Sequence, residues 1–206
     1  MKVQMTSLKY RNNIWIVKPG ENTNRGNGIQ VWSSLHEINN IVRTWRPRKE
    51  TSSVDTAAKV EDNQRRTIIL QKYIDRPLLI NQRKFDIRAY GMLTSINGYL
   101  KGYFNEDGYI RTSSKEFTSK SNDIFIHLTN DAVQKKSEDF GKYENGNKLS
   151  YHDFQKYLKL HYSHLNVWFY RDILPQMRKL MWDCFRSVYG KIDPYRRINR
   201  YLYCFY

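Results

Sequence analysis

The 206-residue sequence has very little cysteine and no long apolar run. Its two cysteines, Cys184 and Cys204, form no CxxC motif, so nothing in the sequence indicates a disulfide framework or a zinc site. The N-terminal residues lack the apolar segment of a signal peptide, and no stretch approaches the roughly 18 apolar residues of a membrane span. We therefore expect a soluble intracellular protein.

Acidic residues are also scarce relative to basic ones. The chain has 20 Asp and Glu against 35 Lys and Arg, a formal net charge of +15, which favours an acidic partner such as nucleic acid, a membrane surface or an acidic polypeptide. No RNP, helix-turn-helix or zinc signature supports nucleic-acid binding. The 40% hydrophobic content can fill a core, and the length suits one sizeable domain.

The first motif is an apolar run that ends in a lysine and is followed by a glycine-bearing loop. Residues 13–18, NIWIVK, predict a buried strand that ends at Lys18. The loop at 20–28, GENTNRGNG, carries Arg25 and matches neither common phosphate-loop pattern. Such a loop can fold over phosphates with its backbone N–H groups, or it can be an ordinary hairpin that returns as a strand over 29–32.

Charged residues alternate along a second predicted strand, residues 84–96. Lys84, Asp86 and Arg88 would project from one face, about 6 to 7 Å apart. Unpaired charge is costly on a buried face. This face therefore either lines a polyanion site or is solvated and held by a Lys-Asp-Arg ladder.

Further short β segments predict a mostly antiparallel sheet. A strand over 67–74 precedes the charged one, and strands over 99–104 and 109–112 follow it. A hairpin turn at 106–108 would separate the last two and put Arg111 on a third neighbouring strand.

The remaining segments predict one more strand, three helices and two irregular regions. Residues 123–130, DIFIHLTN, are expected to form a strand whose single histidine, His127, is most simply a structural one. Helices are expected from Ser34 to Trp45, after a cap formed by Ser150 and Asp153, and over 172–189. The last helix carries an apolar stripe expected to be core: Ile173, Met177, Leu180, Met181, Cys184 and Val188. A flexible insertion at 46–66 and a basic aromatic tail at 191–206 complete the chain.

Several motifs in order resemble the tubulin tyrosine ligase and tubulin tyrosine ligase-like family of ATP-grasp enzymes. They are WIVKP, RGNGI, QKYIDRPLLI, RKFDIRAY, YIRTSS and HLTN, and they run from about Asn13 to Leu158. Residues 141–158, GKYENGNKLSYHDFQKYL, look closer to the tyrosine ligase branch than to the glutamylases. The resemblance implies an α+β, ATP-grasp-like fold, with a mostly antiparallel sheet, flanking helices, and ATP held under the glycine-bearing loop.

The resemblance also implies a reaction. Family members activate a carboxylate with ATP as an acyl phosphate, which an amine then attacks. Here it favours joining tyrosine to tubulin; the alternatives are a glutamylase or glycylase of the same family, or a catalytically dead module that binds tubulin tails or microtubules. The implied partners are the acidic C-terminal tail of tubulin and a free amino acid, not nucleic acid or membrane. The implied location is the cytoplasm, at the cytoskeleton or cilium.

By match to the family motifs, site residues can be named. Lys18 and Lys84 would bind the nucleotide, and Arg25 would lie in the loop over it. The hinge that meets adenine and the segment along the ribose and phosphates would comprise Gln71, Lys72, Tyr73, Ile74, His127, Leu128, Thr129 and Asn130. Asp86 and Arg88 would lie near the γ-phosphate and the reacting carboxylate, and Arg111 would stabilise the acyl phosphate.

One family feature has no match. The strand with an aspartate and the Glu-x-Asn signature that hold Mg²⁺ do not follow Tyr189, and Asp86 alone is a poor metal cage. We therefore expect a partial domain over 13–190 with the metal-binding strands missing and the Mg²⁺ site incomplete, and poor turnover by the isolated chain.

Overall fold

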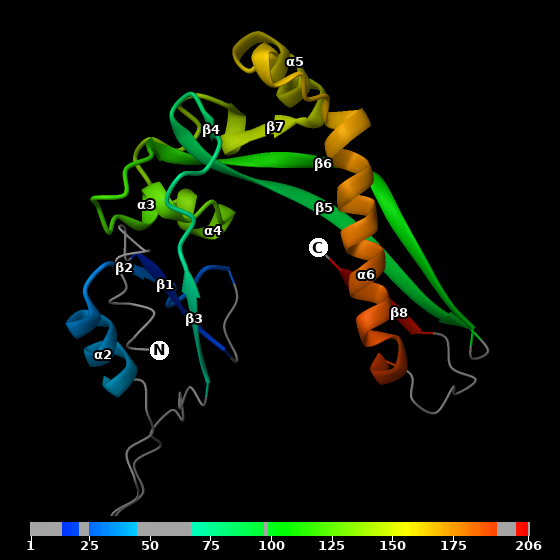
Figure 1. Cartoon of the computed structure of the whole chain (residues 1–206), viewed down its shortest axis with the longest axis horizontal. Helices are drawn as coiled ribbons and strands as arrows, with labels where there is room; N and C mark the ends of the chain where they lie inside the picture. The colour runs from blue at the N-terminus through cyan, green and yellow to red at the C-terminus, as the bar shows by residue number, and fades with distance from the viewer. Residues whose placement is uncertain (1–13, 21–24, 45–66, 97–98, 193–200, 206) are drawn as a thin grey trace, which may run out of the picture. The chain divides into compact units, whose positions relative to one another are not determined.

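The computed structural model describes residues 14–20, 25–44, 67–96, 99–192 and 201–205 (Figure 1). The predicted insertion at 46–66 and most of the predicted tail at 191–206 lie outside these ranges. The chain divides into two compact units: the first comprises 1–84 and 113–139, and the second comprises 85–112 and 140–206. Two long strands, β5 (Arg83–Ile96) and β6 (Tyr99–Glu116), contribute residues to both units.

The first unit contains a three-stranded antiparallel sheet in the order β2-β1-β3. Strand β1 (Trp15–Pro19) pairs with β2 (Gln30–Trp32) on one side and β3 (Ile68–Lys72) on the other. The three strands predicted for these segments are therefore confirmed. Alternate residues of β1 are buried, as expected for a strand with one face on a core.

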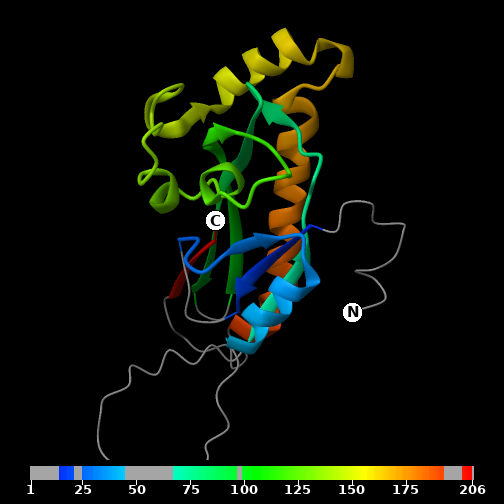
Figure 2. The same cartoon turned by 90° about the vertical axis from the view of Figure 1, so that its left-hand side faces the viewer.

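Helix α2 (Leu35–Thr44) covers one face of this sheet, as Figure 2 shows. Trp15, Val17 and Ile38 form the buried centre of that contact. The Ser34 hydroxyl oxygen accepts a hydrogen bond from the Glu37 N–H at 3.5 Å, which is the predicted N-cap. A second cluster, of Ile14, Val31 and Tyr73, is buried separately and packs against Phe117.

The strand predicted at 123–130 is wrong. A one-turn helix, α3 (Ile124–His127), forms there instead, and a second one, α4 (Asp131–Gln134), follows it. The Asp123 carboxylate accepts from the Phe125 N–H at 2.9 Å and so caps α3. The Gln134 side chain, almost fully buried, accepts from the Ser114 N–H at 2.8 Å and donates to carbonyls of the α3 segment. The Gln134 side chain thereby joins the α3 segment to Ser114, twenty positions away, and holds the turn in place.

The second sheet has the order β4-β5-β6-β7, with β8 (Tyr201–Phe205) also pairing with β5. Strands β4 (Leu79–Ile80) and β7 (Lys148–Ser150) are short. The pairs of β4 with β5, of β8 with β5 and of β7 with β6 are antiparallel. The hairpin turn predicted at 106–108 is wrong, because β6 continues through it. A Cβ at Gly108 would collide with the Arg88 carbonyl and the Tyr151 hydroxyl, so this glycine serves a close approach rather than a turn.

Helices of the second unit flank its part of that sheet. Helix α5 (Tyr151–His161) begins at the predicted cap, where the Ser150 hydroxyl oxygen accepts from the Asp153 N–H at 3.0 Å. Two 3-10 turns, η1 (Asn145–Asn147) and η2 (Ser163–Leu165), and a π-helical segment, η3 (Phe169–Ile173), lie around α5 and before the last helix.

The last helix, α6 (Leu174–Ile192), packs on β5 and β6 through a stripe that differs from the predicted one. Leu180 is 65% exposed and Cys184 is exposed, whereas Phe185 is buried. The reason lies in the sheet: a Cβ at Gly91 would be 2.7 Å from the Met181 sulfur, and a Cβ at Gly102 equally close to the Phe185 ring. None of the helices in the described ranges is long and apolar enough to cross a membrane.

Candidate functional site

The glycine-bearing turn of the first unit lies against the start of α4. Residues 25–28 form the described part of the loop, and Arg25, Gly26 and Gly28 all have positive φ. A Cβ on Gly26 would lie 3.0 Å from the Asn130 side-chain oxygen and 3.1 Å from Val133. Two segments predicted to face the same nucleotide, the loop and the HLTN segment, are therefore in contact.

Lys18 lies on the face of the three-stranded sheet opposite α2. Its ammonium donates to the Gln71 side-chain oxygen at 2.9 Å. The strand register places Ile16 opposite Gln71, so Lys18 and Gln71 share a face by alternation. Lys72 points the other way, with its ammonium 5.4 Å from the centre of the Trp15 ring. The predicted adenine hinge thus presents its side chains on both sides of the strand.

A buried polar cluster surrounds the Lys84 ammonium. This ammonium donates to the Tyr73 hydroxyl oxygen at 3.2 Å and to the His127 carbonyl oxygen at 3.0 Å. The Tyr73 hydroxyl is 2.7 Å from His127 Nδ1, and His127 Nε2 is 2.6 Å from the Ser121 carbonyl oxygen. Three residues predicted from separate motifs, the outer two of them 54 positions apart, are therefore brought together.

Burial controls protonation in this cluster. It lowers the pKa of His127, and the nearby Lys84 ammonium lowers it further, against the opposing effects of the Ser121 carbonyl and Asp123. Burial also raises the pKa of Tyr73. At neutral pH the imidazole is therefore neutral and the phenol keeps its proton.

The other predicted residues of the HLTN segment, and Ile74 of the predicted hinge, differ in exposure. Leu128 and Thr129 are buried, like His127, while Asn130 is half-buried and Ile74 is well exposed.

A fully buried arginine, Arg83, precedes Lys84 and was missed by sequence analysis. Its guanidinium donates to the Ser113 carbonyl oxygen at 3.1 Å, and the Ser113 hydroxyl accepts from the Lys84 N–H at 3.1 Å. Consecutive strand residues face opposite sides, so Arg83 and Lys84 cannot serve the same face. The sequence could have indicated this, because the residue next to Lys84 on a strand lies on the opposite face. A cation on that face needs burial or solvation of its own.

The second unit contains an ion pair between neighbouring strands. Arg111 donates from Nε to Asp86 Oδ1 at 2.7 Å and from Nη2 to Asp86 Oδ2, a bidentate arrangement. The Arg111 side chain is 13% exposed and that of Asp86 is 38% exposed. Arg111 thus lies on the strand next to Asp86, not on a third strand as predicted, and Asp86 is paired across strands rather than along a ladder.

Three further residues share the sheet face of this ion pair, and sequence analysis did not single them out. Tyr90 follows Asp86 by four positions on β5, and Tyr109 precedes Arg111 by two on β6. Lys148 is the β7 partner of Arg111, and its ammonium lies 5.4 Å from the Tyr109 ring centre. A hydrogen bond with Tyr109, together with burial, raises the pKa of Tyr90. The face therefore combines cations with phenolic hydroxyls.

Arg88 is fixed through its backbone. The Tyr151 hydroxyl donates to the Arg88 carbonyl oxygen at 2.9 Å, and burial raises the pKa of Tyr151 to about 12. The strand carrying Asp86 and Arg88 is thereby anchored to α5.

The described residues do not fit a Mg²⁺ site. In these ranges no three His, Cys, Asp or Glu side chains come together to hold a metal ion. Both oxygens of Asp86 accept from Arg111, which competes with any cation for the same carboxylate.

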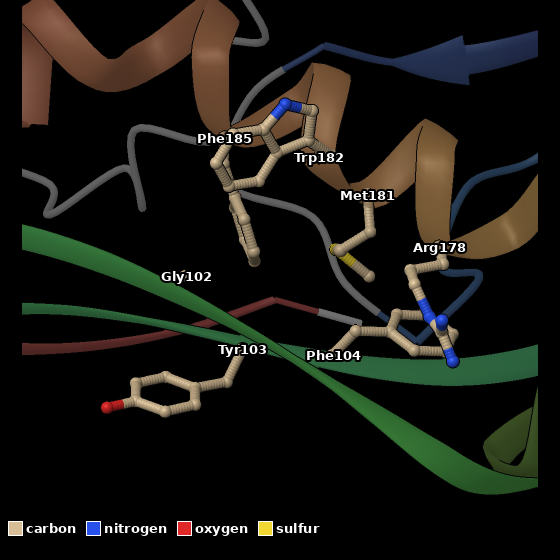
Figure 3. A pocket seen from close by; sticks show the side chains of 7 residues that line it. All are labelled: Gly102, Tyr103, Phe104, Arg178, Met181, Trp182 and Phe185. Atoms are coloured by element: carbon tan, nitrogen blue, oxygen red, sulfur yellow. The ribbon is translucent and has the colours of Figure 1, made fainter.

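A pocket of about 190 Å³ lies between α6 and β6 in the second unit (Figure 3). Aromatic and apolar side chains dominate its lining, with Met181, Trp182 and Phe185 from the helix. Arg178 is at its edge, where it forms an ion pair with Glu106. No predicted site residue lines this pocket.

The predicted site residues divide between the units. Asp86, Arg88 and Arg111 belong to the second unit, and all the others belong to the first. That Lys18 and Lys84 bind the nucleotide whose γ-phosphate lies near Arg88 and Arg111 stays a prediction.

Comparison with known proteins identifies the family. Tubulin glycylase 3A of Drosophila melanogaster is 33% identical over 204 residues, which is 95% of this chain and 18% of that protein. Tubulin monoglycylase TTLL3 of Homo sapiens is 37% identical over 126 residues, 61% of this chain and 14% of that protein. A probable alpha-tubulin polyglutamylase of Tetrahymena thermophila is 30% identical over 154 residues, 73% and 34% respectively.

The chain spans only a minor part of the length of each of these relatives. A profile of the tubulin-tyrosine ligase family matches residues 2–181, which include every predicted site residue. The predicted resemblance and the α+β, mostly antiparallel fold are confirmed. This chain belongs to the tubulin-tyrosine ligase family.

Proposed function

We propose that this chain is part of an ATP-dependent ligase that joins an amino acid to tubulin through an acyl phosphate. The family match over 2–181 carries the proposal, because it spans both units and all the predicted site residues. The relatives' names support tubulin as the protein that is modified.

The first unit supplies groups suited to a polyphosphate. Lys18 and Lys84 are cations held by side-chain hydrogen bonds, and the turn at 25–28 adds Arg25 and backbone N–H groups. Preset positive groups of this kind stabilise phosphate charge without having to reorganise. We assign the nucleotide to these residues.

The second unit supplies groups suited to the reacting carboxylate. In the proposed reaction a carboxylate oxygen attacks the γ-phosphorus of ATP. The bond between that phosphorus and the oxygen that leaves with ADP breaks. The amine nitrogen then attacks the acyl carbon, phosphate leaves, and the amine loses a proton. Arg88 and Arg111 would stabilise the negative charge of the acyl phosphate. Asp86 would orient the Arg111 guanidinium through its two hydrogen bonds.

The transferred amino acid distinguishes three versions of the proposal. The likeness of residues 141–158 to the tyrosine ligase branch favours tyrosine, whereas the relatives named above are a glycylase, a monoglycylase and a polyglutamylase. Incubation with tubulin, ATP and labelled tyrosine, glycine or glutamate in parallel separates them by which label enters tubulin.

Charge supports the acidic tail of tubulin as the docking partner. With tubulin as the partner, the location would be the cytoskeleton, in cytoplasm or cilium. A chain of net charge +15 attracts an acidic peptide, and the attraction weakens as salt rises. Binding should therefore fall steeply with ionic strength and should be lost for tubulin whose tails have been removed by limited proteolysis.

A second candidate function is a tubulin-binding module without catalysis. The lack of a metal-binding cluster among the described residues favours it. Calorimetric titration with ATP separates the two. ATP binding that Lys84→Met weakens, with label incorporation, supports the ligase; microtubule co-sedimentation without ATP binding or incorporation supports the module.

A further inference from the structure

The donor and the acceptor can be assigned for each hydrogen bond around Lys84. The Ser121 carbonyl can only accept, so His127 Nε2 carries the proton, and Nδ1 of the neutral ring is an acceptor. The Tyr73 hydroxyl must then donate to Nδ1, which leaves its oxygen to accept from the Lys84 ammonium. A relay therefore runs from Lys84 through Tyr73 and His127 to Ser121.

Little of the Tyr73 ring or of the His127 ring is accessible to a ligand. Tyr73 is 4% exposed and His127 is 2% exposed, and both ring nitrogens of His127 are engaged inside the protein. Phe117 closes the cluster, with its ring centre 6.4 Å from that of Tyr73 and 6.1 Å from that of His127. Lys84 is the half-buried member of this group.

The Lys84 ammonium is held by the Tyr73 side chain and by the His127 carbonyl. The Tyr73 hydroxyl and the His127 carbonyl accept from it, and it lies 4.6 Å from the centre of the Tyr73 ring. A lysine side chain has four rotatable bonds, and fixing it before a ligand arrives removes an ordering cost from binding.

We propose that Tyr73 and His127 are positioning residues, which do not touch the nucleotide but hold the Lys84 ammonium where it meets the phosphate chain. This rests on the proposed function, because it takes the phosphate chain of ATP as the anion that Lys84 binds. It replaces the roles predicted for these two side chains, which placed Tyr73 in the hinge that meets adenine and His127 in the segment along the ribose and phosphates.

The first test measures the ammonium itself, without nucleotide. Tyr73→Phe removes only the hydroxyl and keeps the ring over which Lys84 lies. Loss of a hydrogen bond to a charged group should increase the rate at which an amine-reactive reagent acylates Lys84 about tenfold. Quantitative mass spectrometry reads the rate, with Lys156 of α5 as the unaffected control. His127→Gln should act in the same direction, and unchanged labelling of Lys84 in both variants overturns the proposal.

The second test measures which part of the nucleotide the relay serves. Calorimetry should give about tenfold weaker ATP binding to Tyr73→Phe, with adenosine binding unchanged. In a Lys84→Met background, Tyr73→Phe should weaken ATP no further. Equal losses for ATP and adenosine, or independent losses in the double variant, would mean that Tyr73 is merely structural and would overturn the proposal.

The two tests keep the inference separate from the proposed function. If the wild-type chain binds no ATP, the proposed function is refuted and, with it, the phosphate as the target of Lys84. The labelling experiment still decides whether Tyr73 and His127 hold the ammonium.

Discussion

Asp86 and Arg111 form an ion pair, but replacing one partner should reduce stability more than replacing the other. Arg111 is 13% exposed and Asp86 is 38% exposed, so water can solvate the carboxylate far better than the guanidinium. Asp86→Asn leaves a mostly buried cation without this carboxylate, whereas Arg111→Gln leaves an accessible anion. We expect the first substitution to destabilise the chain more than the second.

The magnitude follows from the burial of the pair. Two charges about 4 Å apart in a medium of effective dielectric constant near 20 attract by about 4 kcal/mol. Desolvation of the guanidinium and screening of the partly exposed carboxylate offset most of this, which leaves a coupling of about 1 to 2 kcal/mol. Asp86→Asn should cost about 2 kcal/mol and Arg111→Gln about 1 kcal/mol.

Urea unfolding at neutral pH of both single variants and the double variant measures these values as a cycle. Lys156→Gln, which removes an exposed pair with Asp153, is the matched control and should leave the midpoint unchanged. A coupling near zero, or a larger loss for Arg111→Gln than for Asp86→Asn, would refute the reasoning from burial.

Three further predictions concern packing, pH and capping. Gly102→Ala should destabilise the chain by about 1 to 3 kcal/mol, because the new methyl group meets the Phe185 ring; Gly190→Ala, with nothing within 4 Å, should be neutral or stabilise it in the same urea assay. The pKa of His127 is lowered from its ordinary 6.5, so the unfolded chain takes up the proton first as pH falls. Stability should drop below about pH 6.5 until the folded pKa is reached, and His127→Gln should remove that contribution to a series of urea midpoints. Ser150→Ala should cost about 1 kcal/mol by circular dichroism melting, and Ser150→Asp should recover most of it.

Elements that depend on near neighbours could be predicted from the sequence. The alternation in residues 15–19 gives a strand whatever it packs on, and the Ser150 cap depends on an N–H three residues away. The antiparallel pairing of β1 with β2 is that of a strand that returns after the loop at 20–28. Hydrophobic period and local hydrogen bonds carry that information.

Elements fixed by distant partners could not be predicted. Gly108 looked like a turn residue, but its role is set by Arg88 and Tyr151, which approach it from β5 and α5. The buried edge of α6 is set by Gly102, which admits Phe185 and turns Leu180 outward. A short apolar run cannot distinguish a strand from a helical turn, and distant bonds decided in favour of helix at 124–127.

The candidate site shows the same limit and adds a chemical distinction. Charge alternation singled out Lys84, Asp86 and Arg88 but could not name what holds each. The contacts that Tyr73 and His127 make with Lys84 come from neutral groups, so they orient the ammonium without cancelling its charge. The contact that Asp86 makes with Arg111 cancels charge as it orients. An incoming phosphate would therefore meet the full charge of Lys84, whereas an anion at Arg111 must share the guanidinium with a carboxylate already bound to it.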